Sequence, residues 1–251
     1  MTAIAILSDV HGNLEALQAV LGRIDELGIG AIYCLGDTVG YGPDPDLCLA
    51  LTEQRCHLRL MGNHEYAVFH SESTGFNFNP VARQAIEWTR ERVSQAGLLP
   101  SLGRLKSFRL EGPLLFVHGS ARNALNEYIL ESDASGFSNF DDILASLEAD
   151  FTDFRICFVG HNHKPFLATR EGFLHPHDQL RTFQVPPDEV FYASVGSVGQ
   201  PRDRDPRACF VTFDGAQLTY HRVTYPHAIT AEKIRDRGLP GFLADRLAVG
   251  R

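Results

Sequence analysis

Residues 158–164 read FVGHNHK, and they point to the fold because two histidines follow an apolar run after a single glycine. The run at 154–159, FRICFV, has the apolar and β-branched content of a buried strand. Gly160 ends it, and His161 and His163 follow with one residue between them. Two imidazole rings at the end of a strand have little structural use. Four other apolar runs in this sequence end in a similar way.

Each of these other runs is followed by a motif that contains Asp, Asn or His. The runs lie at 3–7, 31–35, 56–61 and 113–117, and the motifs after them are DVH at 9–11, GD at 36–37, GNHE at 62–65 and HG at 118–119. In open α/β sheets, ligands collect beyond the carboxyl ends of the strands. We therefore expect the five motifs to converge at one edge of the fold.

Helix signals separate the first strands. Asn13 is predicted to cap a helix whose face carries Leu14, Leu17, Leu21 and Ile24, and a second helix is predicted from Pro45. This β-α-β-α-β order favours parallel neighbours in a sheet.

Further helices are predicted from Asn79-Pro80 through Trp88, near 139–149 and over 228–247, and short antiparallel strands over 165–223. We expect one domain over residues 1–251 with two packed sheets. Within it, 66–104 could form a helical cap over the site, although Phe69, Phe76, Phe78 and Trp88 could equally be core or a dimer contact.

Composition narrows the class of protein. The chain of 251 residues is 44% hydrophobic and 22% charged, the balance of a folded globular protein. Its net charge of -8 disfavours nucleic acid as the main partner. The five cysteines show no paired spacing, and Cys34 and Cys157 are expected to be reduced core thiols. Because no apolar run reaches membrane-spanning length, we expect a cytoplasmic protein that does not bind the membrane.

The polar residues at the strand ends have the chemistry of metal ligands. Seven candidates are too many for one tetrahedral zinc, and they suit two divalent ions that share a carboxylate: Asp9, His11, Asp37, Asn63, His118, His161 and His163. We expect the D-x-H and H-x-H pairs to be extended, which would put both side chains of each pair on one side. Two ions about 3.5–4 Å apart can clamp a phosphate and activate a bridging water.

In this order the motifs resemble those of the calcineurin-like metallophosphoesterases. The segment GSVGQPRD at 196–203 is further similar to that of the small bacterial and archaeal phosphoesterases of the YfcE type. The resemblance implies a four-layer α/β/β/α sandwich of two mixed sheets flanked by helices, with a dinuclear centre between the sheets.

The resemblance also implies a role for each ligand. One ion would be held by Asp9, His11 and His163, the other by Asn63, His118 and His161, and Asp37 would bridge both. His64 would contact the phosphate or protonate the leaving oxygen. Glu65 is expected to support the ligands, with a solvated side chain as the alternative.

One departure from the family pattern bears on the substrate. Protein Ser/Thr phosphatases and symmetrical dinucleoside tetraphosphatases carry an arginine where this chain has Tyr41, and tyrosine cannot replace a bidentate guanidinium. Asn13, Tyr41 and Arg202 are candidate substrate contacts. A helix cap is the alternative for Asn13, and a solvated charged loop is the alternative for Arg202.

The sequence thus predicts a dinuclear-metal phosphoesterase with Asp37 and His64 as catalytic residues, more specifically a phosphodiesterase that acts on a small phosphorylated substrate such as a nucleotide. The alternatives are a phosphomonoesterase, a nucleotide pyrophosphohydrolase or a non-catalytic scaffold on the same fold. Manganese is the favoured metal, while iron, zinc, nickel and cobalt also suit these ligands. A homo-oligomer is compatible with the sequence.

Overall fold

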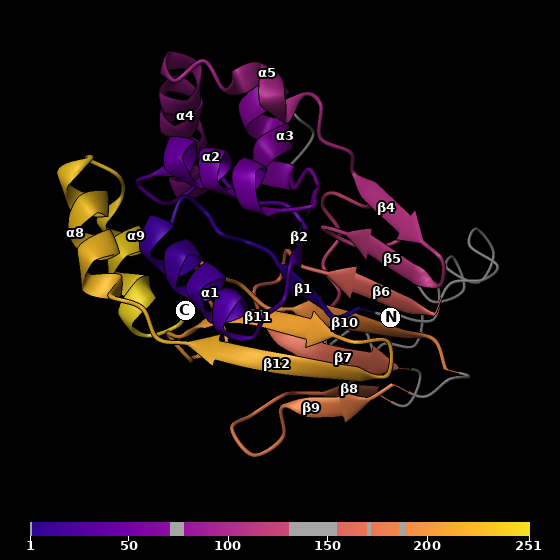
Figure 1. The fold of residues 1–251 in the computed structure, drawn as a ribbon. Helices are drawn as coiled ribbons and strands as arrows, with labels where there is room; N and C mark the ends of the chain where they lie inside the picture. The colour runs from indigo at the N-terminus through magenta and orange to yellow at the C-terminus, as the bar shows by residue number, and fades with distance from the viewer. Residues whose placement is uncertain (1, 71–77, 131–154, 170–171, 186–188) are drawn as a thin grey trace.

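The computed structural model describes residues 2–70, 78–130, 155–169, 172–185 and 189–251, which form two facing sheets and a set of helices (Figure 1). The first sheet has the order β3-β2-β1-β11-β12-β9 and the second β4-β5-β6-β10-β7-β8. The strands of the first sheet are β1 (Ile4–Leu7), β2 (Ala31–Cys34), β3 (Leu58–Arg59), β9 (Thr182–Gln184), β11 (Ala208–Phe213) and β12 (Gln217–Val223). Those of the second are β4 (Phe108–Glu111), β5 (Leu114–Val117), β6 (Ile156–Val159), β7 (Pro165–Thr169), β8 (Gly172–Leu174) and β10 (Phe191–Val195).

Both sheets are mixed, as the resemblance implied. Strands β1, β2 and β3 are parallel, which confirms the β-α-β-α-β prediction, and β11 joins β1 antiparallel. In the second sheet β5, β6 and β10 are parallel. The strands within 165–223 pair antiparallel with one another, as expected, and β10 in addition pairs parallel with β6, because it inserts between β6 and β7.

The core between the sheets is rich in aromatic residues. Phe116 and Phe158, from neighbouring strands, stack with ring centroids 5.2 Å apart, and Phe213 packs on Phe158 from the facing sheet. The predicted helix face of α1 (Leu14–Glu26) is buried on the outer side of the first sheet, beside α2 (Pro45–Arg55). On the outer side of the second sheet Ile129 joins a buried cluster with Tyr192. The helix predicted near 139–149 lies outside the described residues.

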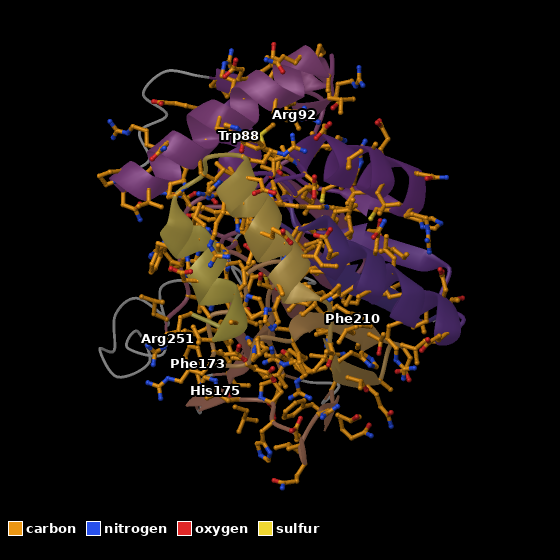
Figure 2. The ribbon with its side chains drawn as sticks, turned by 90° about the vertical axis from the view of Figure 1, so that its left-hand side faces the viewer. Trp88, Arg92, Phe173, His175, Phe210 and Arg251 are labelled. Atoms are coloured by element: carbon orange, nitrogen blue, oxygen red, sulfur yellow. The ribbon has the colours of Figure 1, made fainter. Side chains whose placement is uncertain are left out.

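Of the remaining helices, those between residues 63 and 102 lie above the sheets in Figure 1, and those after residue 226 lie at the left, beside α1, and face the viewer in Figure 2. Phe69 and Phe78 contact a buried cluster that includes Leu49 of α2, while Trp88 contacts the C-terminal helices. These three residues of the 66–104 segment thus pack within the chain, and Phe76 lies outside the described residues. No helix in the described part of the chain is both long and apolar enough to cross a membrane. The helices are α3 (Asn63–His70), α4 (Pro80–Gln95), α5 (Leu99–Leu102), α8 (His227–Asp236), α9 (Gly241–Asp245) and the 3-10 turn η1 (Arg246–Ala248).

Candidate metal centre and active site

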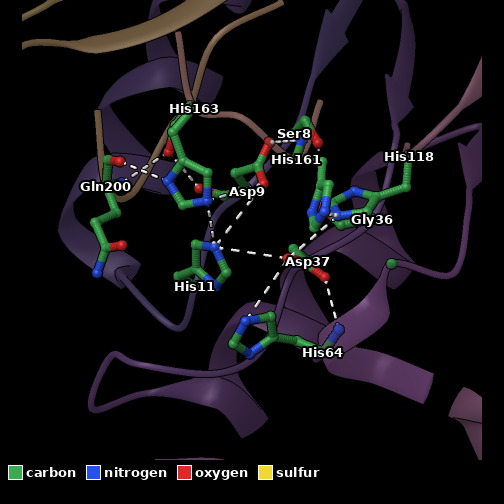
Figure 3. A network of polar contacts seen from close by, with 12 residues as sticks. Ser8, Asp9, His11, Gly36, Asp37, His64, His118, His161, His163 and Gln200 are labelled. Carbon is green, nitrogen blue, oxygen red and sulfur yellow. Dashed lines mark hydrogen bonds and ion pairs between the residues drawn. The ribbon is translucent and has the colours of Figure 1, made fainter. Parts of the chain in front are cut away.

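The five strand-end motifs meet at one edge of the two sheets, as predicted (Figure 3). The backbone N–H of His161, after β6, donates to Asp9 Oδ2, after β1, over 3.1 Å, so this bond joins one sheet to the other. The GSVGQPRD segment lies beside it. Gly199 N–H and the Ser197 hydroxyl both donate to the carbonyl of Asp9, at 2.9 and 2.8 Å. Strand ends that are distant in the sequence are thereby fixed relative to one another.

Asp9, His11 and His163 form the first cluster. His11 Nε2 lies 3.1 Å from His163 Nε2, which lies 3.3 Å from Asp9 Oδ1. The Nδ1 atoms of the two histidines face backbone carbonyls, of Val39 at 3.0 Å and Gln200 at 2.7 Å. A carbonyl can only accept, so each Nδ1 carries the proton and each Nε2 presents a lone pair.

Three electron-rich atoms therefore face one another in the first cluster. Burial holds the pKa values of His11 and His163 well below the ordinary value, which keeps the rings neutral. Asp9 Oδ1 is buried and has no hydrogen-bond partner among the described residues. Such an arrangement is unfavourable by itself and becomes favourable around a cation, so the donor set fits a divalent metal.

Asp37, Asn63, His118 and His161 form the second cluster. His118 Nε2 lies 3.1 Å from Asn63 Oδ1, 3.2 Å from His161 Nδ1 and 3.3 Å from Asp37 Oδ2. Burial alone would lower the pKa of His118, but the Asp37 carboxylate outweighs burial and raises it to about 9. The carboxylate therefore favours a positive charge on His118, and the same negative potential would favour a bound metal cation.

Asp37 lies between the two clusters. Its Oδ2 is 3.7 Å from His11 Nε2 and 3.3 Å from His118 Nε2, while Oδ1 accepts the backbone N–H of His64 at 2.9 Å. Burial would raise the pKa of Asp37, but the surrounding histidines hold it far below its usual value. An ionised carboxylate oxygen directed at both clusters is what a bridging ligand requires.

The local backbone differs from the expected geometry. The D-x-H and H-x-H pairs are not extended: φ is +54° at Asp9, +48° at His11, +66° at His161 and +60° at His163. Positive φ is uncommon outside glycine and persists where the surroundings enforce it. The prediction of an extended backbone was wrong for both pairs, although both residues of each pair take part in the site. His161 lies in the second cluster and His163 in the first.

At two of the glycines in these motifs, a side chain from another strand end comes too close for any residue larger than glycine. A Cβ at Gly62 would overlap the Asp37 carboxylate, and one at Gly160 would overlap the Ser8 hydroxyl. At both positions only hydrogen fits between the strand ends. These glycines therefore set the distance between the motifs.

Glu65 holds the backbone beside two candidate ligands, as expected for a residue that supports them. Its buried carboxylate accepts the backbone N–H groups of Asp37 at 2.7 Å, Gly62 at 2.9 Å and Val39 at 3.0 Å. Burial raises the pKa of Glu65 to about 7, against the pull of these N–H groups. One side chain thus ties the loop that carries Asp37 to the loop that carries Asn63.

His64 lies at the mouth of the site and is not part of either proposed ligand set. Its Nε2 is 4.0 Å from Asp37 Oδ2, and its ring contacts Tyr41 and Phe78 at centroid distances of 4.6 and 5.3 Å. Its Nδ1 is buried and has no hydrogen-bond partner in the part of the chain that the structure describes, and burial lowers the pKa of the ring to about 4. The ring is therefore free to hydrogen-bond a substrate that enters the pocket.

A pocket of about 300 Å³ opens over both clusters. Tyr41 and Arg202, two of the candidate substrate contacts, line it, and the Arg202 guanidinium lies 5.9 Å from the Tyr41 ring centroid. Asn13 does not line this pocket. Its side chain caps α1 through Ala16 N–H and bonds the Gly199 carbonyl, so the helix-cap alternative describes its position.

Other pocket residues had not been singled out as substrate contacts. Asn126 and Tyr128 reach the pocket from the segment that follows His118, and Asn79 reaches it from the start of α4. The Tyr128 ring stacks on His161 with centroids 3.8 Å apart and planes 16° apart. No strand-end motif marks 120–130, so only its position directly after a ligand motif could have pointed to these residues.

Comparison with known proteins is consistent with this geometry. The family model for calcineurin-like phosphoesterases matches residues 2–193. The uncharacterized protein MJ0912 of Methanocaldococcus jannaschii is 35% identical over 254 residues, which cover 99% of this chain and 98% of that protein.

Two solved structures are similar over the full length. The metallophosphoesterase from Sphaerobacter thermophilus has a TM-score of 0.84 and 36% identity, with 100% of this chain and 99% of that chain covered. The hypothetical protein PH1004 from Pyrococcus horikoshii OT3 has a TM-score of 0.79 at 18% identity with the same coverage, which shows a shared fold. The chain therefore belongs to the calcineurin-like phosphoesterase family, whose members are metal-dependent phosphoester hydrolases.

Proposed function

We propose that this protein is a phosphodiesterase that uses two divalent metal ions and acts on a small phosphorylated substrate. The observation that carries the proposal is the position of Asp37 Oδ2, directed at two clusters of buried nitrogen and oxygen donors. Asp9, His11 and His163 would hold one ion, and Asn63, His118 and His161 the other. Ions bound there would activate a water molecule for attack on the phosphorus and would stabilise negative charge on the phosphate.

The protein side chains around this centre have separate tasks. His64 lines the pocket and would hydrogen-bond the phosphate, and the negative charge of the bound phosphate would raise the lowered pKa of the ring so that it could give a proton to the leaving oxygen. Arg202 supplies a positive charge to the phosphate from the side of Tyr41. In this way Arg202 provides a cation near the position where the related phosphatases carry their arginine.

The pocket favours a diester over a monoester. Apart from histidines, Arg202 is the one cationic side chain among the described residues that line it, and the other lining residues are aromatic or amide side chains together with Ala82 and the Asp37 carboxylate. A diester carries one negative charge and a second organic group that this wall can contact. A monoester dianion would call for more positive charge. Manganese suits the mixed nitrogen and oxygen donors, and the same donors accept iron, zinc, nickel or cobalt.

The test is hydrolysis of bis-p-nitrophenyl phosphate by the full-length protein with Mn²⁺, compared with p-nitrophenyl phosphate, a cyclic nucleotide and a dinucleoside polyphosphate. His64→Ala is the active-site variant, and His70→Ala, at the exposed end of the same helix, is its matched control. We expect the diester to be the best substrate, with activity lost in His64→Ala and kept in His70→Ala. Metal-dependent activity no higher than that of His64→Ala would support the non-catalytic scaffold instead.

A further inference from the structure

The two clusters hold their histidines by different means. In the first cluster, His11 and His163 each donate Nδ1–H to a backbone carbonyl, which fixes the ring for a ligand at Nε2. In the second, His161 turns its Nδ1 toward His118. Its other ring nitrogen, Nε2, is buried and has no hydrogen-bond partner in the described part of the chain. The usual outer hydrogen bond is thus missing for His161.

An aromatic ring is stacked on His161 in place of that bond. Tyr128 lies parallel to the imidazole, with centroids 3.8 Å apart and an angle of 16° between the planes. The Tyr128 ring is not packed in the core, because the residue is 43% exposed and lines the pocket. Among the described residues, the ring that Tyr128 contacts is the imidazole of His161, a proposed metal ligand.

The position of Tyr128 is fixed by its neighbours. The next residue, Ile129, is 2% exposed, and its carbonyl accepts the side-chain N–H of Asn162 at 3.3 Å. Asn162 lies between the two histidines of the H-x-H motif, and its Oδ1 accepts the Ser194 hydroxyl at 3.0 Å. The middle residue of the motif therefore anchors the segment that carries Tyr128 against His161.

We infer that Tyr128 is a positioning residue that holds the His161 imidazole ready for the second metal ion by stacking. This inference rests on the proposed two-metal site. Stacking on one face restricts rotation of the imidazole and leaves Nδ1 directed at the second cluster. When His161 binds a cation its ring becomes more positive, and attraction to the π face of tyrosine grows. The phenol hydroxyl is not needed for this task.

The experiment measures metal binding by the full-length protein, independently of turnover. Mn²⁺ is titrated calorimetrically into chelator-treated wild type, Tyr128→Phe and Tyr128→Leu, and metal per chain is determined after gel filtration. Phe78→Leu is the matched control, since Phe78 lines the same pocket but contacts His64. We expect Tyr128→Leu to weaken one of the two ions by roughly tenfold, the low end of the effect of removing an outer partner of a ligand. Tyr128→Phe and Phe78→Leu should bind both ions as the wild type does.

The outcomes separate this inference from the proposed function. The ion that stays tightly bound in Tyr128→Leu shows that the variant is folded. Wild type that binds fewer than two ions would overturn the two-metal proposal. If wild type and Tyr128→Leu bind two ions equally well, the role of Tyr128 is overturned and the two-metal proposal is not. Loss of the second ion in Tyr128→Phe as well would also overturn the inference, because it would assign the effect to the hydroxyl.

Discussion

Replacing Glu65 with glutamine should destabilise the protein through one hydrogen bond that an amide cannot make. The buried carboxylate accepts N–H groups from Asp37 and Gly62 at Oε2 and from Val39 at Oε1. A glutamine can place its oxygen where Oε2 lies and keep two of these bonds. Its NH₂ group then faces the Val39 N–H, and that donor is left without an acceptor.

The magnitude follows from this single bond. A hydrogen bond to a charged group contributes about 1.5–3 kcal/mol, and a buried unsatisfied group costs about 1–3 kcal/mol. We expect Glu65→Gln to lower the free energy of unfolding by about 2 kcal/mol, less than the two contributions together, because burial disfavours the ionised carboxylate and the neutral amide does not carry that cost. For a chain of this length that corresponds to a fall in Tm of roughly 4–8 °C.

The assay is thermal unfolding of the chelator-treated protein, followed by circular dichroism. Glu53→Gln is the matched control, because Glu53 forms a surface ion pair with Arg59 and its side chain is 48% exposed. Such a pair contributes less than about 1 kcal/mol. If Glu65→Gln unfolds at the same temperature as the control, the three-bond account of Glu65 is wrong.

Four further variants test the site and its surroundings. His163→Ala and His161→Ala should each lose a different ion in calorimetric titration with Mn²⁺, because the two rings lie in different clusters; identical binding curves would contradict this division. Gly40→Ala should push the His64 ring out of place, since the new Cβ would overlap its Nδ1. A displacement of this kind can lower kcat about 100-fold, and we expect that loss in Gly40→Ala with the metal content unchanged. Normal turnover by Gly40→Ala would argue against a role for His64. Lys233→Met should lower the free energy of unfolding in urea by about 1 kcal/mol by removing a partly exposed cation from two carboxylates; an unchanged midpoint would show that this contact contributes nothing.

The candidate ligand residues could be named, and their convergence predicted, because their signal is local. Each motif directly follows an apolar strand, and parallel strands of one sheet end at the same edge. The candidate ligands around the first and second clusters were therefore all named from the sequence. The extended geometry assumed for the H-x-H pair was wrong, because the positive φ of His161 and His163 is enforced by contacts with distant segments.

The sequence by itself determined the chemistry of this protein, namely the mixed α/β fold, the strand-end motifs and the candidate ligands. These depend on hydrophobic periodicity and on residues adjacent to the strands. Only the tertiary structure decided which groups support and surround the centre. Asn13 is tied to Thr230, 217 residues away, and Tyr128 meets His161 from a segment without a motif. Such contacts arise from packing between remote parts of the chain, which no local pattern records.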